Sequence, residues 1–186
     1  MEAKQTETAE KVKDPKSNAY DWIESLVTAI IACILIFLFL FRVVNVQGSS
    51  MVPTLRESDK IVISRLAGNY KYGDIVVLTK TAFDDESIVK RVIATEGQTI
   101  DIDFDNGTVT VDGKVLDEPY IAEKTRRQMD FQGPVTVPEG CIFCMGDNRN
   151  QSTDSRRSII GMIDTRCVLG RVILRLWPLN KFGTVT

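Results

Sequence analysis

Histidine is absent from this chain of 186 residues. Its absence excludes a Ser-His-Asp triad and a Cys-His pair, because an imidazole is the general base in both. Cysteine is scarce, with four scattered residues, so a zinc site of the usual kind is not expected. The bases that remain are carboxylates, thiols and lysines. A lysine can serve only where burial or a neighbouring cation lowers its pKa towards neutrality.

Concentrated charge of one sign is also missing. The 23 basic residues nearly balance the 25 acidic ones, and no basic cluster indicates a nucleic-acid partner. The sequence has no glycine-rich phosphate loop, and no metal, nucleotide or other cofactor is expected.

Only one long apolar run occurs. The seventeen residues from Ser25 to Phe41 carry no charge, and Val43, Val44 and Val46 extend the run beyond Arg42. A transmembrane helix needs roughly 20 apolar residues, with a lower limit near 17. We therefore predict a transmembrane anchor over residues 21–44, preceded by a polar cytoplasmic tail, residues 1–20.

The alternatives for this run are a buried core helix and a cleaved signal peptide. The run is longer than the apolar part of a signal peptide, about 7–15 residues, and no small-x-small cleavage pattern follows it. Trp22 and Arg42 suit the two membrane interfaces. Four lysines in the first 20 residues favour a cytoplasmic amino terminus only slightly.

Residues 45–186 show no sustained helical periodicity and read as short β-branched strands between turn residues. Asp105-Asn106-Gly107 is a strong hairpin signal between two of them. We predict one mainly β, antiparallel domain, with strands at 60–64, 74–78, 87–95, 99–104, 108–111, 135–137, 141–145 and 167–174.

A serine-rich turn follows the apolar run directly, from Gly48 to Leu55. Pro53 fixes one backbone angle and favours a rigid turn. Such a turn can hold Ser50 exposed, but a serine is a weak nucleophile at its own pKa and needs a base.

The best candidate for that base is Lys90, in the run from Ser87 to Ala94. Alternate residues of a strand share a face, which places Lys90 with Ile88, Val92 and Ala94. Burial on such an apolar face lowers the pKa of a lysine. The alternative is a lysine at a solvated edge, with only its aliphatic stem packed.

A third polar group lies between Met145 and Arg156, directly after a predicted strand. It is either a plain surface turn or part of a site. In a site, Ser152 would orient the lysine. Asp147 or Asp154 would pair with Arg91 or Arg156.

Four segments together resemble the conserved boxes of bacterial type I signal peptidases, in the same order and behind the same kind of anchor. The resemblance covers about residues 20–180. The segments are Ser50-Met51-x-Pro53-Thr54-Leu55, Gly73-Asp74-Ile75-Val76-Val77, Lys90-Arg91-Val92 and Gly146-Asp147-Asn148-Arg149-x-x-Ser152-x-Asp154-Ser155-Arg156.

The resemblance implies a membrane-bound serine endopeptidase with a Ser-Lys dyad, whose β-sheet catalytic domain is of the signal-peptidase type. Ser50 would be the nucleophile, Lys90 the general base and Ser152 the residue that orients the lysine. The Ser50 N–H would donate to the oxyanion. Some members have a serine two residues before the nucleophile, and its hydroxyl is a second oxyanion donor. This sequence has Gly48 at that position, as in the Gram-positive pattern. Structural ion pairs would involve Asp147, Asp154, Arg156 and Arg91.

The resemblance further implies removal of N-terminal signal peptides from exported pre-proteins, with small residues at the first and third positions before the cut. An extended peptide on a strand edge presents those two side chains on one face. The implied partners are secretory pre-proteins, membrane lipid and a nearby export translocon, with the catalytic domain outside the cytoplasm in a single-pass protein. The implied pocket lining is Met51, Leu55, Val77, Ile88 and Val89.

Two other functions fit parts of the sequence. Ser87-x-x-Lys90 and Lys80-Thr81-Ala82 echo the motifs of penicillin-binding enzymes, but that chemistry needs a helix where this sequence predicts a strand. A catalytically inactive, anchored β-domain that binds exported peptides is the other alternative.

The cysteines favour no motif. Cys141 and Cys144 would point to opposite faces of a strand, so a bond between them is not expected. A bond from one of them to Cys167 stays open.

Overall fold

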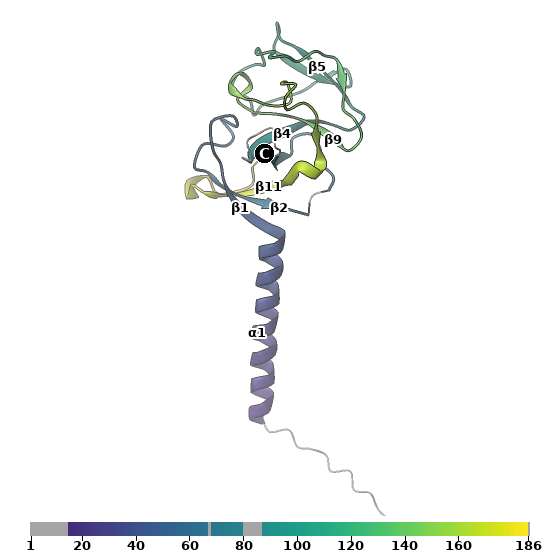
Figure 1. The fold of residues 1–186 in the computed structure, drawn as a ribbon. Coiled ribbons are helices and arrows are strands. Elements are labelled where there is room, and N and C mark those ends of the chain that lie inside the picture. Colours follow the sequence, from purple (N-terminus) through teal and green to yellow (C-terminus); the bar gives the residue numbers. More distant parts are fainter. Residues whose placement is uncertain (1–14, 67, 80–86, 186) are drawn as a thin grey trace, which may run out of the picture. The chain divides into compact units, whose positions relative to one another are not determined.

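A computed structural model describes residues 15–66, 68–79 and 87–185 (Figure 1). The chain forms two compact units, one within residues 1–39 and one from Leu40 to Thr186. The first is helical and the second is built of β-strands.

The first unit is the helix α1, Pro15–Leu40. Its part from Ala19 to Leu40 is long enough and apolar enough to cross a membrane. Those 22 residues span about 33 Å at 1.5 Å per residue, close to the hydrocarbon thickness of about 30 Å. Large apolar side chains such as Ile23, Leu26 and Phe37 are exposed along it, which is typical of a lipid-facing helix.

The helix ends before the predicted anchor does. Strand β1, Phe41–Asn45, begins directly after Leu40 and pairs antiparallel with β2, Lys60–Ser64. The last part of the predicted span, through Val44, is therefore strand. The β-branched Val43 and Val44 favour extended backbone, and β1 is paired with β2 along its whole length.

The second unit contains a seven-stranded antiparallel sheet in the order β1-β2-β11-β3-β4-β9-β10. Its remaining strands are β3 (Ile75–Leu78), β4 (Ile88–Thr95), β9 (Cys141–Met145), β10 (Ile163–Asp164) and β11 (Val168–Trp177). The strand β4 lies between β3 and β9, so its middle is buried from both sides.

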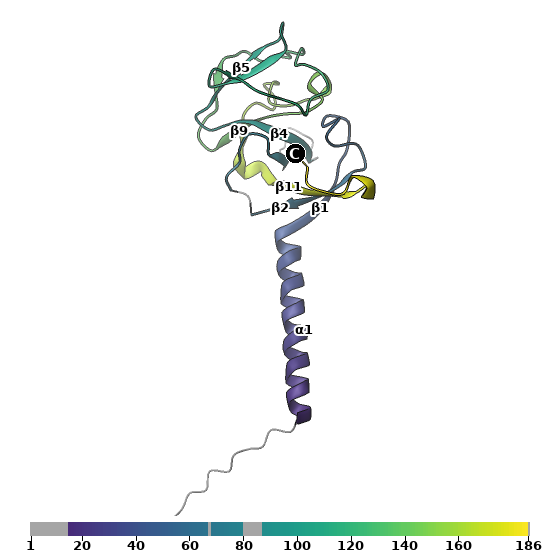
Figure 2. The ribbon, with the colours of Figure 1, turned by 180° about the vertical axis from the view of Figure 1, so that it is seen from behind.

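A smaller antiparallel sheet has the order β7-β6-β5-β8. Its strands are β5 (Thr99–Asp103), β6 (Thr108–Val111), β7 (Lys114–Val115) and β8 (Val135–Thr136). Ile100, Val109 and related side chains pack on Ile93 and Phe143 of the larger sheet. Figures 1 and 2 both place β5 at the opposite end of this unit from β1, β2 and β11.

The mainly β, antiparallel architecture confirms the predicted fold class. All eight predicted strands are present, and the turn at Asp105-Asn106-Gly107 joins β5 to β6 with the register Asp103↔Thr108. Three strands were not predicted. The apolar run concealed β1, and β7 and β10 have two residues each, too few to show alternation.

One detail of β4 differs from simple alternation. Ile88 and Val92 pack in one apolar cluster and Val89 in another, as alternation predicts. Ala94, predicted to share the face of Lys90, packs instead in the same cluster as Ile93. A β-bulge between Val92 and Ala94 shifts the register against β9, and a bulge adds one residue and reverses the facing beyond it.

Candidate active site

The turn that carries Ser50 is held by its own backbone and by buried side chains. The Val52 N–H donates to the Ser49 carbonyl over 3.1 Å, and the Leu55 N–H donates to the Met51 carbonyl over 2.8 Å. Met51 and Leu55 are fully buried in the cluster beneath. The turn is therefore anchored from below, while Ser50 itself remains half-buried at its surface.

Lys90 lies against this serine. Its Nζ donates to Ser50 Oγ over 2.8 Å and to the Val89 carbonyl over 3.0 Å. The side chain is 3% exposed. The predicted pair of nucleophile and base is thus brought into contact from β4 and from the turn after β1, forty residues apart in the sequence.

The surroundings of Lys90 favour a neutral amine. Burial lowers its pKa from 10.5 to about 8, because the charged ammonium loses its hydration. The carboxylates of Asp154 and Asp147 act in the opposite direction and stop the pKa from falling further. A useful fraction of the amine is therefore unprotonated near neutral pH.

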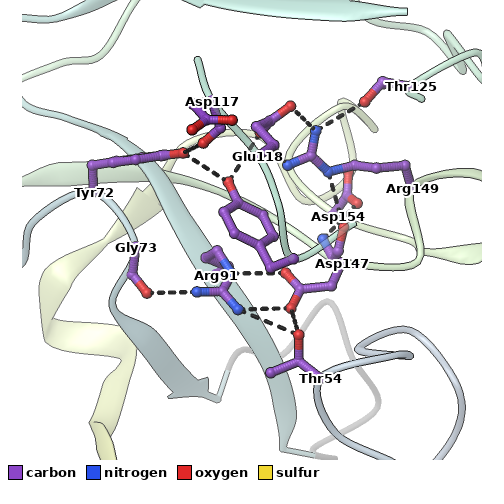
Figure 3. A network of polar contacts seen from close by, with 12 residues as sticks. Thr54, Tyr72, Gly73, Arg91, Asp117, Glu118, Thr125, Asp147, Arg149 and Asp154 are labelled. Carbon is purple, nitrogen blue, oxygen red and sulfur yellow. Dashed lines mark hydrogen bonds and ion pairs between the residues drawn. The ribbon is translucent and has the colours of Figure 1, made fainter. Parts of the chain in front are cut away.

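The loop after β9 supplies these carboxylates, each in a two-pronged ion pair. Arg91 Nε and Nη2 donate to the two oxygens of Asp147, each over 2.8 Å (Figure 3). Arg156 Nε and Nη2 donate in the same way to Asp154. All four side chains are buried. Of the pairings left open by the sequence, the structure has Asp147 with Arg91 and Asp154 with Arg156.

The ion pair with Arg156 affects the protonation of Asp154 as well as its position. Burial opposes ionisation of Asp154, yet the hydrogen bonds and the charge of Arg156 hold the pKa of that carboxyl below its usual value. Thr54 Oγ1 donates to Asp147 Oδ2 over 2.5 Å, which links the serine turn to the Arg91–Asp147 pair. Two-pronged contacts of this kind define orientation strongly.

The same loop also contacts the nucleophile residue through its backbone. The Asn148 N–H donates to the Ser50 carbonyl over 3.0 Å, and Asn148 Nδ2 donates to the Ser49 carbonyl over 3.2 Å. Gly146 packs so closely on the Ser50 carbonyl that an added Cβ would lie 2.5 Å from its oxygen. Only glycine fits there.

Ser152 is buried beside Gly146. It lies close enough to Asp154 to favour the charged carboxylate, yet its Oγ is in hydrogen-bond geometry with no residue that the structure describes. The predicted bond from Ser152 to Lys90 is therefore not formed here, because Lys90 Nζ is directed to Ser50 and to the Val89 carbonyl. Its orienting role stays a prediction.

An open pocket of about 800 Å³ lies in front of the dyad. It is lined by residues 45–48 and Ser50 from one side and by residues 87–90 from the other, with Glu57, Ser58 and Lys60. Of the predicted lining residues, Ile88 and Val89 face this pocket, and so does Gly48, whose φ of +74° suits glycine. Met51, Leu55 and Val77 are buried with Val89 in the apolar cluster instead.

The site includes buried polar residues to which the sequence assigned no role. Arg149 is buried and forms an ion pair with Glu118. The Tyr120 ring lies 3.9 Å from Arg91 Cζ. Arg149 belongs to the segment Gly146–Arg156 that resembles a conserved box of the family, so the sequence did offer a signal for its role. Glu118 and Tyr120 lie in an irregular segment after β7 and had none.

Of the other candidate groups, Cys144 lies near Lys90 and Asp154. All four cysteines are free thiols, and burial raises the pKa of Cys144. Among residues 15–66, 68–79 and 87–185, no group of three or more metal-binding side chains lies together. Lys80-Thr81-Ala82 lies outside the described residues.

Comparison with known proteins gives this geometry a context. Residues 19–177 match the family model described as signal peptidase, peptidase S26. Signal peptidase I of Bacillus licheniformis is 35% identical over 187 residues, covering 94% of this chain and 97% of that protein. Signal peptidase I P of Bacillus subtilis subsp. natto is 37% identical, covering 92% and 96%. A solved signal peptidase I from Enterococcus faecalis V583 has a TM-score of 0.46 at 27% identity, covering 56% of this chain and 97% of that one.

The family match spans most of the chain and includes both sides of the Ser50–Lys90 contact. The two Bacillus relatives exceed 30% identity over nearly their whole length. The chain therefore belongs to the signal peptidase family, peptidase S26, and is a serine protease.

Proposed function

We propose that this protein is a membrane-bound endopeptidase that removes N-terminal signal peptides from exported pre-proteins by a Ser-Lys dyad. The observation that carries the proposal is the 2.8 Å contact between Lys90 Nζ and Ser50 Oγ, with the lysine almost fully buried. A nucleophile within hydrogen-bond reach of a base with a lowered pKa is the arrangement that covalent catalysis requires.

The chemistry follows from the neutral amine. Lys90 Nζ takes the proton of the Ser50 hydroxyl while Oγ attacks the carbonyl carbon of the scissile peptide bond. The resulting ammonium then donates that proton to the leaving amine, and the signal peptide remains bound to Ser50 as an ester. Lys90, neutral again, deprotonates a water molecule that hydrolyses the ester and frees the serine.

The oxyanion formed in each attack needs a hydrogen-bond donor. The Ser50 N–H is the proposed donor, and it has no hydrogen-bond partner among the residues that the structure describes. Losing one such donor typically costs about 2.7–4 kcal/mol in transition-state stabilisation. Gly48 carries no side chain that could supply a second donor, so backbone groups dominate this part of the site.

Binding of the peptide as an added strand is supported by unpaired strand edges at the pocket. Strand β9 pairs with β4 only from Arg91 onward in the described pairings, which leaves Ile88–Lys90 unpaired on that side. The facing wall is lined by Asn45, Val46, Gln47, Gly48 and Ser50. An extended substrate between these walls alternates its side chains, so the first and third residues before the cut share a face. Ile88 and Val89 both line the pocket and offer apolar contacts to such residues.

The anchor would keep this pocket near its substrates. Helix α1 provides one span, with the amino terminus in the cytoplasm and the β unit on the outer side. Trp177, Leu179 and Phe182 form an exposed apolar group at the end of β11 and in the following turn. Exposed aromatic residues of this kind favour lipid interfaces, so we propose that this group contacts lipid.

The direct test compares the wild type with Ser50→Ala in detergent, using a pre-protein with an Ala-x-Ala site. We expect cleavage after the second alanine by the wild type and none by the variant, with the product ends identified by mass spectrometry. A folded wild type that leaves the pre-protein intact, or a variant that cuts at the same site, would overturn the proposal.

A further inference from the structure

Three buried arginines lie in or against the loop after β9, and only two of them, Arg91 and Arg156, are neutralised by carboxylates of that loop. Arg91 has Asp147 as its partner. Arg149, in the short turn Arg149–Gln151 of the loop, is 0% exposed in its side chain and has no carboxylate partner within the loop. A buried guanidinium needs a counter-charge, because its hydration is lost.

The counter-charge of Arg149 comes from the other part of the β unit. Glu118 lies just after β7 of the smaller sheet. Its Oε2 accepts from Arg149 Nη1 over 2.8 Å and its Oε1 accepts from Nη2 over 2.5 Å (Figure 3). Thr125 Oγ1 accepts from Nη1 over 2.9 Å. The guanidinium is thus held in a two-pronged contact made by residues from outside the loop.

Arg149 in turn determines the course of the loop. Its Nε donates to the Gly146 carbonyl over 3.2 Å, and its own carbonyl accepts from Arg156 Nη2 over 2.6 Å. The Gly146 N–H donates to Asp154. Gly146 is also the residue that packs directly on the Ser50 carbonyl. A shift of Arg149 would therefore displace the peptide on which the nucleophile residue rests.

Tyr120 adds a second connection from the same segment. Its hydroxyl donates to Glu118 Oε1 over 3.0 Å, and its ring lies 3.9 Å from Arg91 Cζ and 5.9 Å from Arg149 Cζ. Cations are attracted to the faces of aromatic rings at such distances. The irregular segment after β7 thus contacts both Arg91 and Arg149.

We propose that Glu118 is a positioning residue of the protease: through Arg149 it holds the loop Gly146–Arg156 in the geometry in which Ser50 and Lys90 react. The segment after β7, which contributes no residue to the dyad or to the pocket in front of it, thereby takes part in catalysis. The proposal rests on the proposed function for its substrate.

Glu118 and Arg149 do not line the pocket where the peptide is proposed to bind. A defect at Glu118 should therefore lower the rate of the bound complex and leave binding nearly unchanged. A small displacement of reacting groups can reduce rates by about 10²-fold.

The experiment uses the full chain in detergent and a peptide that spans an Ala-x-Ala site. We expect Glu118→Gln to lower kcat at least tenfold while KM stays within twofold of the wild type. Glu123→Gln is the matched control. Glu123 comes from the same segment and contacts Asn150 of the same loop, but it is exposed and neutralises no buried charge. Its kcat should equal that of the wild type.

A second variant tests the route of the effect. If Glu118 acts through Arg149, Glu118→Gln should cause no further loss of kcat in an Arg149→Met background, because coupled residues are not additive. Equal kcat for Glu118→Gln and Glu123→Gln would overturn the proposal. So would a full additional loss in the Arg149→Met background.

Amide hydrogen exchange provides a readout that needs no substrate. Exchange of residues 146–155 should accelerate at least tenfold in Glu118→Gln, with β4 and the β5–β6 hairpin unchanged. Should that variant fail to fold, Glu118→Asp, which keeps the charge one methylene shorter, is measured instead. Unchanged exchange in the loop would overturn the positioning role. If Glu118→Gln shows the accelerated loop exchange but the wild type cuts no signal peptide, the proposed function alone is overturned.

Discussion

Lys90 is the residue whose environment matters most for the proposed chemistry. A lysine in the middle of a sheet is costly, since its ammonium has left water. The described contacts compensate only in part, through Ser50 Oγ and the Val89 carbonyl. The uncompensated part of the lost hydration lowers the pKa of Lys90 and makes the amine available as a base.

The pH dependence of cleavage should report this directly. With a pKa of about 8, Lys90 is mostly protonated below that pH and mostly neutral above it. We expect kcat/KM to rise roughly tenfold per pH unit up to about 8 and then to level off, since kcat/KM follows the free enzyme. Lys90→Arg should be inactive throughout, because a guanidinium stays protonated. An active Lys90→Arg enzyme would contradict the dyad.

The cost of burying the charged amine also predicts that Lys90 lowers the stability of the protein while it is required for activity. Lowering the pKa from 10.5 to about 8 disfavours the folded, charged form by about 3 kcal/mol, at about 1.4 kcal/mol for each factor of ten. Lys90→Met should therefore be inactive yet up to about 3 kcal/mol more stable at pH 7, measured by chemical unfolding followed by near-ultraviolet circular dichroism.

The wild type provides the control for that measurement. Between pH 8 and 10.5 its unfolded chain binds more protons than the folded one, so the lysine makes the free energy of unfolding rise with pH. This rise should be missing in Lys90→Met. A variant less stable than the wild type at pH 7 would show that the lysine contributes more by packing than it costs by burial.

Sequence predicted some of these residues better than others. Ser50, Lys90 and the carboxylates of the loop stand in short local patterns, and the structure brings them together. Glu118 and Tyr120 stand in an irregular segment, and their roles depend on contacts with residues about 30 positions away. Such non-local pairing leaves no periodicity to read. The same limit applies to the choice between Asp147 and Asp154 as the partner of Arg91.

At the scale of elements, the site lies where β4, the serine turn and the loop after β9 contact one another. The sequence predicted β4 because its run is long and β-branched, and β9 because it is a short apolar run that follows the turn residues Glu139 and Gly140. Strand β1 was not predicted because its valines extend the apolar run of the helix, interrupted only by Arg42, and composition alone does not mark the change from helix to strand. The bulge in β4 was also unpredictable, since it depends on pairing with β9.

The Arg91–Asp147 pair should be the most sensitive connection between these elements. Asp147→Ala leaves a buried guanidinium without its counter-charge and leaves Thr54 without an acceptor. Breaking a buried pair typically costs about 3–5 kcal/mol. We expect a loss of that size in the free energy of unfolding, measured with urea in detergent.

Asp164→Ala is the matched control, because Asp164 forms an exposed ion pair with Arg166 on the far edge strand. Solvent already screens that pair, so its removal should shift the urea midpoint far less. Similar shifts for the two variants would show that the buried pair does not hold the site together.

For the whole molecule, the proposed anchor should matter only for substrates that share its membrane. A chain that begins at Phe41 keeps all of β1. We expect it to cleave a short soluble peptide with the kcat/KM of the full chain. On a pre-protein inserted in vesicles it should be slower by about 10²-fold, because two partners held at one surface gain effective concentration. Equal rates on the inserted pre-protein would contradict a role for the anchor.

Helix α1 ends at Leu40 and the nucleophile is Ser50. Ten residues of extended chain span at most about 35 Å, so Ser50 cannot lie farther than this from the end of α1. With α1 as the proposed anchor, this length limits the distance of the nucleophile from the bilayer surface. We therefore expect peptide bonds within this distance of the membrane to be cleaved, and cleavable sequences farther from it to be spared.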